Sequence, residues 1–139
     1  METITVSHPL KQVIEAADRA ITAEDFDALM DFYADDATLV VKPGLNAVGK
    51  EQIRRAFDTI ADYFNHSLVV TQGEMVVIEG GDTALVIMES ILEATGKDGL
   101  AFSMMRQGTY VFRRSATGKW LCVIDNSYGT DLLKGDHTV

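Results

Sequence analysis

The stretch Phe32-Tyr33-Ala34-Asp35-Asp36-Ala37-Thr38 marks the point where the sequence changes from helical to extended patterning. Before it, apolar residues between positions 26 and 33 recur at the three- and four-residue spacing of a helix. After it, the run 38–42 is rich in β-branched residues and ends at Pro43-Gly44, a turn signal. The sequence therefore predicts a helix that stops near Ala34-Asp35-Asp36 and a short strand over residues 38–42.

Two further helices are predicted on either side of this corner. Upstream, apolar residues from Leu10 to Ile21 trace one helical face, with Ser7 as the N-cap and Pro9 in the first turn. Downstream, Gly49 opens a pattern whose apolar positions, between 53 and 64, again have helical spacing.

From about residue 67 onward the sequence has strand patterns, separated by glycine-containing turns near residues 80–82, 96–99 and 115–118. Such regular turns predict an antiparallel meander. Its four strands are expected at Ser67–Glu79, Thr83–Thr95, Leu100–Arg114 and Lys119–Ser127. Helices grouped before a meander predict the α+β class. We expect one domain over residues 1–139, with a frayed tail from Asp131.

Charge and composition argue against several classes of partner. The net charge is −9 and the basic residues are scattered, so neither nucleic acid nor an anionic membrane surface is an expected partner. No apolar run approaches the ~20 residues of a membrane span, and the first residues lack the pattern of a signal peptide. The one cysteine, Cys122, can form no disulfide within the chain. We expect a cytoplasmic protein.

Several short motifs, in this order and spacing, resemble those of the nuclear-transport-factor-2-like superfamily, which includes ketosteroid isomerase and the SnoaL-like polyketide cyclases. The corner at residues 32–38 resembles the helix-to-strand junction of that superfamily. The other motifs are similar to its second-helix start, third-helix start, last hairpin and last strand: Asp25-Phe26-Asp27, Gly49-Lys50-Glu51-Gln52-Ile53, Gly118-Lys119-Trp120 and Asp125-Asn126-Ser127. The resemblance covers residues 8–131 and is nearest to the YybH-type branch of small bacterial SnoaL-like proteins.

The resemblance implies a cone-shaped fold, in which three N-terminal helices pack on a strongly curved, mainly antiparallel sheet of the cystatin-like type. It implies a ligand pocket inside the cone and homodimers formed through the outer face of the sheet. It does not define a reaction, because this fold carries enzymes, transport factors and association modules alike.

The chemistry of ketosteroid isomerase is not expected here. That enzyme needs a carboxylate base on the short strand before a proline, and a first-helix tyrosine that holds the developing oxyanion. The matching positions are Lys42, or Val41 after a slip of one residue, and Ala17.

SnoaL-like cyclases use an aspartate on a late strand, and Asp125 resembles it. In an unbroken strand, however, Trp120, Cys122, Ile124 and Asn126 share the face opposite to Asp125. If Trp120 points into the cone, we expect Asp125 to point outward.

Glu89 is the candidate catalytic acid or base. It lies between two isoleucines on one face of the expected strand Thr83–Thr95. Burial there would raise the pKa of its carboxyl toward the range that general acid/base catalysis uses. The alternatives are a structural ion pair with Arg106 or Arg113 on the next strand, or simple exposure.

Six further residues are candidate ligand contacts. Lys42 and Arg106 would orient a carboxylate or enolate; alternatively, Lys42 is a solvated lysine at a strand end and Arg106 the partner of Glu89. Tyr63 lies near the expected mouth of the cone, next to His66, which we interpret as capping the helix end.

The remaining three are Asn126, Trp120 and Tyr33. Asn126 would donate a hydrogen bond at the mouth or close the final strand. Trp120 and Tyr33 would line the pocket or belong to the core.

Two functions are therefore open. The first is a small-molecule pocket protein that performs acid/base chemistry on an apolar carbonyl compound, with a small apolar or weakly acidic ligand. The second is a non-enzymatic association module. We expect no cofactor and no metal, because the sequence has no dinucleotide fingerprint, phosphate loop or spaced set of His, Cys and carboxylate ligands.

Overall fold

Six strands and three α-helices make up the part of the chain that the computed structural model describes, residues 8–134. In chain order the elements are α1 (Pro9–Ala23), α2 (Phe26–Leu29), the 3₁₀ helix η1 (Met30–Phe32), β1 (Tyr33–Lys42), β2 (Leu45–Val48), α3 (Lys50–Tyr63), β3 (Val69–Gly80), β4 (Thr83–Thr95), β5 (Ala101–Arg114), β6 (Trp120–Asn126) and the 3₁₀ helix η2 (Gly129–Leu133). The predicted α+β class is confirmed.

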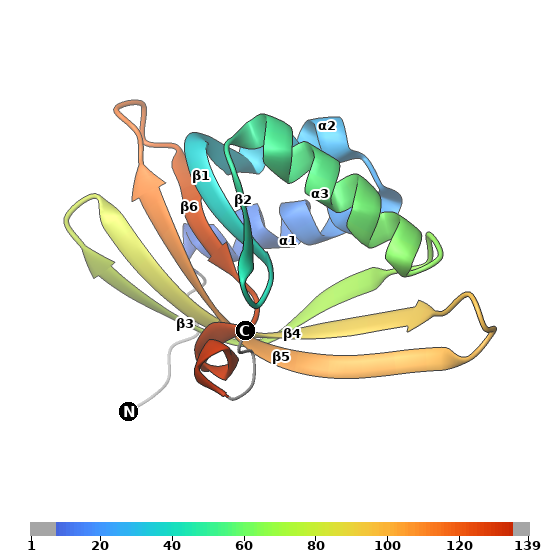
Figure 1. Ribbon diagram of the computed structural model, residues 1–139. Coiled ribbons are helices and arrows are strands. Elements are labelled where there is room, and N and C mark those ends of the chain that lie inside the picture. Colours follow the sequence, from blue (N-terminus) through green and yellow to red (C-terminus); the bar gives the residue numbers. More distant parts are fainter. Residues whose placement is uncertain (1–7, 135–139) are drawn as a thin grey trace.

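The strands form one sheet in the order β2-β1-β6-β5-β4-β3. All neighbouring pairs are antiparallel except β1 and β6, which run parallel. The sheet is strongly bent and wraps around α1 and α3, as the ribbon view shows (Figure 1). The last strand therefore lies between the first strand of the chain and the third strand of the meander.

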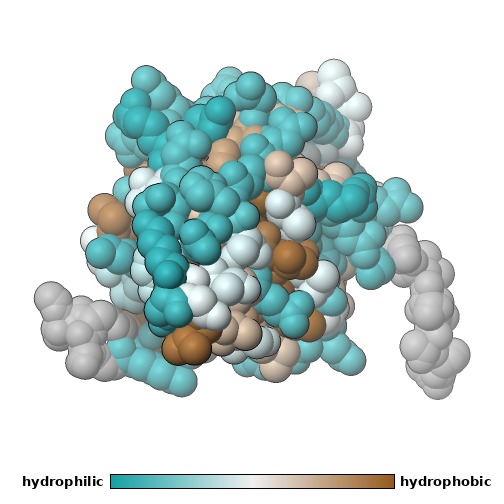
Figure 2. All heavy atoms as spheres, turned by 90° about the vertical axis from the view of Figure 1, so that its right-hand side faces the viewer, coloured by the Kyte–Doolittle hydropathy of each residue, from teal (hydrophilic) through white to brown (hydrophobic). Residues whose placement is uncertain are grey.

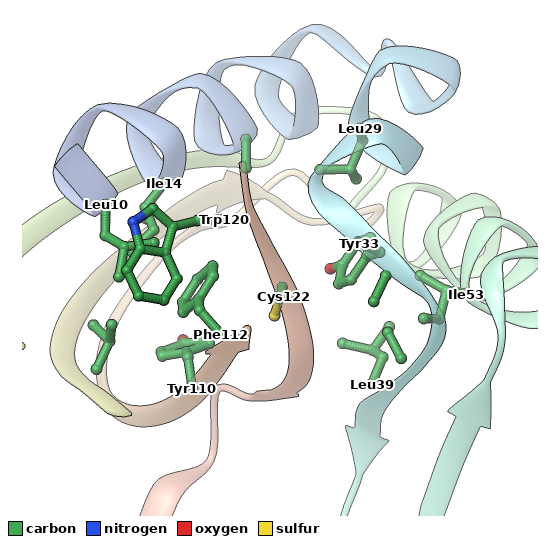
Figure 3. Close-up of a cluster of buried hydrophobic side chains, with 14 of the residues drawn as sticks. Leu10, Ile14, Leu29, Tyr33, Leu39, Ile53, Tyr110, Phe112, Trp120 and Cys122 are labelled. Carbon is green, nitrogen blue, oxygen red and sulfur yellow. The ribbon is translucent and has the colours of Figure 1, made fainter. Parts of the chain in front are cut away.

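The core lies between the helices and the concave face of the sheet. Helix α1 contributes Leu10, Ile14 and Ala17, whose spacing places them on one buried face. They meet Phe112 and Trp120 from β5 and β6 (Figure 3). The helical periodicity of the sequence thus predicts the packed face of α1 correctly.

The helix–strand corner differs from the prediction. Helix α2 ends at Leu29 and one 3₁₀ turn follows, so β1 already begins at Tyr33 rather than at Thr38. Asp25 caps this short helix by accepting a hydrogen bond from the Ala28 amide at 3.3 Å. Because the strand starts at Tyr33, the side chain of this residue is carried on the sheet.

Three smaller differences concern the start of α1, the strand after the turn that follows β1, and the residues after β6. Strand β2 was not predicted, because its four residues follow the turn at Pro43-Gly44 without an apolar alternation. Helix α1 is capped by His8, whose Nδ1 accepts from the Leu10 amide at 3.0 Å, while Ser7 lies outside the described residues. The tail was expected to fray from Asp131, but η2 continues to Leu133, and residues 135–139 lie outside the described part of the chain.

Candidate functional site

A cavity of about 530 Å³ lies between α1, α3 and the concave face of the sheet. Most of its wall is apolar, with Met88 and Leu92 of β4 among the lining side chains. The opening lies between the β1–β2 hairpin and the C-terminal half of α3, where the exposed lining residues are found: Lys42, Leu45, Thr59 and Tyr63. On the side where α3 ends, hydrophobic atoms lie among hydrophilic ones (Figure 2). The size and lining suit a small organic molecule.

Asp125 lies in the wall of this cavity, and the expectation that it points outward is wrong. In the β5–β6 ladder, Phe112 pairs with Cys122 but Val111 pairs with Ile124, so Val123 is an extra residue in β6. Such a bulge reverses the alternation of the residues after it. Trp120 and Cys122 face the core before the bulge, and Asp125 faces the cavity after it.

The carboxyl of Asp125 is tied to Tyr33. The Tyr33 hydroxyl donates a hydrogen bond to Asp125 Oδ2 at 2.6 Å, and its oxygen is turned toward β6 in the close-up (Figure 3). Burial raises the pKa of Asp125 to about 6, although the bond from Tyr33 acts in the opposite direction. Burial and the nearby Asp125 raise the pKa of Tyr33 well above its ordinary value, so this hydroxyl stays protonated and remains a donor.

A second carboxyl, that of Asp18 on α1, lines the same cavity. Its Oδ2 accepts a hydrogen bond from Gln72 Nε2 at 2.9 Å. Burial raises the pKa of Asp18 to about 7, and the charge of Asp125 contributes to the same shift. The other side-chain atom of this amide, Gln72 Oε1, is buried without a hydrogen-bond partner among the described residues.

Two neighbouring strands of the sheet, β4 and β5, add one hydroxyl each to the polar part of the wall. Ser90 on β4 is 5% exposed, and Tyr110 on β5 is buried to the same degree. Burial raises the pKa of Tyr110 above its ordinary value, while a side-chain hydrogen bond with Ser90 opposes the shift. A Cβ on Gly108 would lie 2.5 Å from the Tyr110 hydroxyl oxygen, so this glycine makes room for the ring.

Four of the predicted site residues lie around this cavity: Tyr33, Lys42, Tyr63 and Arg106. Arg106 is half-buried, its Nη1 lies 3.5 Å from Ser127 Oγ, and its Cζ is 4.1 Å from the centroid of the Tyr128 ring. Lys42 and Tyr63 lie at the rim. Ala17, at the position of the isomerase tyrosine, also lines the cavity, and its neighbour Asp18 supplies the polar group on this helix.

Glu89 lies outside the cavity, on the convex face of the sheet. The concave face of β4 carries Met88 and Ser90, so Glu89 between them points the other way. Its Oε1 accepts the Glu74 amide at 3.2 Å where β3 is bulged. The alternative pair with Arg113 is not formed, because Arg113 Nη2 lies 3.0 Å from Asp36 Oδ1.

Trp120 and Asn126 do not line the cavity either. Trp120 is buried in the core, where the Arg114 guanidinium lies 5.1 Å from its ring. Asn126 Oδ1 accepts the amides of Tyr128 and Gly129, at 3.2 and 3.1 Å, and its Nδ2 lies 3.2 Å from Thr109 Oγ1. Asn126 therefore closes the end of β6, as its alternative interpretation stated. His66 pairs with Glu24 at 3.1 Å.

Among residues 8–134, no group of three or more His, Cys, Asp or Glu side chains is arranged to hold a metal ion. None of the helices in this part of the chain has the length and apolarity of a membrane span.

The family model of the SnoaL-like domain matches residues 13–123 of the chain. No curated protein matches the chain. The solved structures similar to it include an NTF2-like protein with a cystatin-like fold from Novosphingobium aromaticivorans, at 21% identity and a TM-score of 0.73, covering 91% of this chain and 87% of that one.

Two further similar structures carry different functional names. A candidate dehydratase of the NTF2-like family from Streptomyces avermitilis is 21% identical with a TM-score of 0.71, over 83% of this chain and 90% of that one. A candidate calcium/calmodulin-dependent protein kinase II association domain from Xanthomonas campestris is 18% identical with a TM-score of 0.69, over 89% and 93%. These likenesses confirm the predicted fold.

Proposed function

Because the chain belongs to the SnoaL-like domain family, we propose that its cavity binds a small apolar molecule and moves a proton at a carbonyl or hydroxyl group of that molecule. The observation that supports this proposal is the pair of carboxyls, Asp18 and Asp125, in the wall of one mostly apolar cavity. Acid/base catalysis near neutral pH uses carboxyls whose pKa is raised in this way.

The two carboxyls have different roles in the proposal. The hydrogen bond from Tyr33 favours the charged form of Asp125, while the nearby charge of Asp125 favours the protonated form of Asp18. Asp125 is therefore the base, held in position by the Tyr33 hydroxyl, and Asp18 is the acid, held by Gln72. The hydroxyls of Ser90 and Tyr110 are further hydrogen-bonding groups for the substrate oxygen.

We expect the protein to exchange the protons beside the carbonyl group of an apolar ketone with deuterium from solvent. Proton NMR in D₂O on 2-tetralone and larger ketones measures this rate directly. Asp125→Asn should lower it by about a hundredfold or more, because a positioned acid or base contributes roughly 10²–10⁴-fold.

Glu89→Gln is the matched control for this experiment, because Glu89 is a carboxylate outside the cavity and the glutamine oxygen can still accept the Glu74 amide. It should leave the exchange rate unchanged. Equal exchange by wild type and Asp125→Asn, or no acceleration for any ketone of the panel, would reject the acid/base proposal.

A second proposal concerns the convex face of the sheet. Its exposed side chains include Val76 (56%), Ile78 (52%) and Ile87 (41%). Cross-strand pairs join them into rows: Val76 lies opposite Ile87, and Ile78 opposite Leu85. An exposed apolar face of this kind marks an interface. We propose that a second copy of this chain covers it, so that the protein is a homodimer.

Ile87→Asp should convert a dimer into a monomer, because it places a charge in the middle of this apolar face, where it would be desolvated. Light scattering after size-exclusion chromatography measures the mass. Leu100→Asp, at an exposed leucine in the turn between β4 and β5, is the control and should not change it. A ring larger than a tetramer would instead support the association module, and a monomeric wild type would reject both.

A further inference from the structure

Two thirds of the basic residues of this acidic protein are paired with a carboxylate of the described chain. Of its twelve Lys and Arg residues, eight have a carboxylate oxygen within 4.0 Å. Within residues 8–134, the four without such a partner are Arg19, Lys42, Arg106 and Lys119. Two of these four, Lys42 and Arg106, line the cavity.

Lys42 and Arg106 lie at the same level of the sheet. Leu39 of β1 is level with Asp125 of β6, and Asn126 is level with Thr109 of β5. Lys42 comes three residues after Leu39, and Arg106 comes three residues before Thr109. Both therefore lie beside the turn that follows β6. The two cations therefore flank this turn, one on each neighbouring strand.

Tyr128 in that turn connects the two sides. Its hydroxyl donates to the Val41 carbonyl at 3.3 Å, next to Lys42, and its ring lies 4.1 Å from the Arg106 guanidinium carbon. Arg106 also contacts Ser127 Oγ at 3.5 Å and Met104 Sδ at 3.4 Å, both neutral groups. The guanidinium is thus held in place at the cavity wall, and no carboxylate of residues 8–134 is paired with its charge.

We propose that the ligand of the cavity is an apolar carboxylic acid, whose carboxylate binds Arg106 and Lys42 at the rim. The apolar body then extends along the cavity toward Asp125 and Asp18. The orientation is fixed by charge, because the ionised Asp125 at the inner wall would repel a carboxylate while the two cations at the rim attract it. This inference rests on the proposed binding function of the cavity and adds the class of ligand and its direction.

The test compares matched pairs of acid and amide, which differ in charge but hardly in shape. The probes are phenylacetate, 2-naphthylacetate and 1-pyrenebutyrate, each with its primary amide, in isothermal titration at low salt. We expect at least one acid to bind about tenfold or more tightly than its amide, because a hydrogen bond between two charged groups is stronger than one to a neutral amide. Arg106→Gln should remove this preference.

Two variants separate recognition from a loss of structure. Arg106→Lys keeps the charge and should retain part of the preference, and Lys119→Gln, at an equally unpaired cation outside the cavity wall, should retain all of it. Binding of no acid, equal binding of acid and amide, or an unchanged preference in Arg106→Gln overturns the inference.

The two proposals fail in different ways. Asp125→Asn should lower deuterium exchange about a hundredfold and keep a preference for the acid over the amide, whereas Arg106→Gln should remove that preference. Lys119→Gln, outside the cavity wall, should change neither result. An acid preference without any exchange would reject the acid/base proposal alone. Exchange without an acid preference would reject only the assignment of the ligand class.

Discussion

Asp18→Asn is expected to stabilise the protein at pH 8 by about 3–4 kcal/mol and to leave its stability at pH 4 nearly unchanged. The pKa of this carboxyl is raised from 3.8 to about 7 on folding, chiefly by burial. A carboxyl with a higher pKa in the folded state favours folding while protonated. The free energy of unfolding therefore falls as pH rises from about 4 to about 7, at 1.36 kcal/mol per pKa unit.

Asparagine stays neutral at every pH, and its Oδ1 can accept the bond from Gln72 that Asp18 accepts now. The charges near this position are those of Asp125, Glu15 and Arg19. Urea unfolding at pH 4, 6 and 8 measures the profile. A difference between wild type and variant that does not change with pH would contradict the prediction.

Asp36→Asn provides the control with the opposite sign. The pKa of Asp36 is lowered by its hydrogen bond with Arg113, so its charged form favours folding. The asparagine variant should lose stability at pH 8 and not gain it.

If Asp18 is the proposed acid, Asp18→Asn should also be more stable than wild type and less active, which is the usual relation at catalytic groups.

Gly129→Ala is expected to destabilise the protein by about 3 kcal/mol or more, from a strained backbone and an overpacked site. Gly129 is buried and has φ +56°, and a Cβ there would overlap the carbonyl oxygen of Gln107. This carbonyl belongs to β5, so the overlap forces the turn after β6 away from the sheet. The Tyr128 ring and the Arg106 guanidinium would be displaced with it.

Gly81→Ala is the matched control. Gly81 has φ +62°, close to that of Gly129, but no atom lies within 4 Å of the position of its Cβ. It carries the backbone strain alone and should cost roughly 1–2 kcal/mol. Thermal or urea unfolding compares the two variants. Equal losses would show that contact with Gln107 does not determine the effect.

The order of elements could be predicted because it depends on local patterns. The apolar positions of α1 and α3 follow the helical period, and the glycines of the meander turns stand where the strands end. The end of α2 could not be predicted in this way. Phe26 and Leu29 are buried as the periodicity indicates, but Tyr33 is buried from a strand, and its apolar character does not distinguish the two.

The site depends on bulges, and bulges are not encoded in alternation. Counting by twos places Asp125 opposite to Trp120, yet the extra residue Val123 turns both toward the interior. For Glu89 the sequence could show an unusual carboxylate among isoleucines, but not which face of β4 is convex. Asp18 could have been recognised as a candidate from the sequence, because this carboxylate follows Ala17 on the packed side of the first helix.

The position of β6 between β1 and β5 has a consequence for synthesis of the chain. Asp125 and Tyr33 are 92 residues apart, so the bond between them forms only after the last strand has been made. A nascent chain that ends before Trp120 has the three described α-helices and five of the six described strands, but β1 and β5 each keep an unpaired edge. Such edges are where chains associate wrongly. Translation of β6 therefore supplies two things within a few residues. These are the strand that joins β1 to β5, and Asp125, which completes the pair of carboxyls.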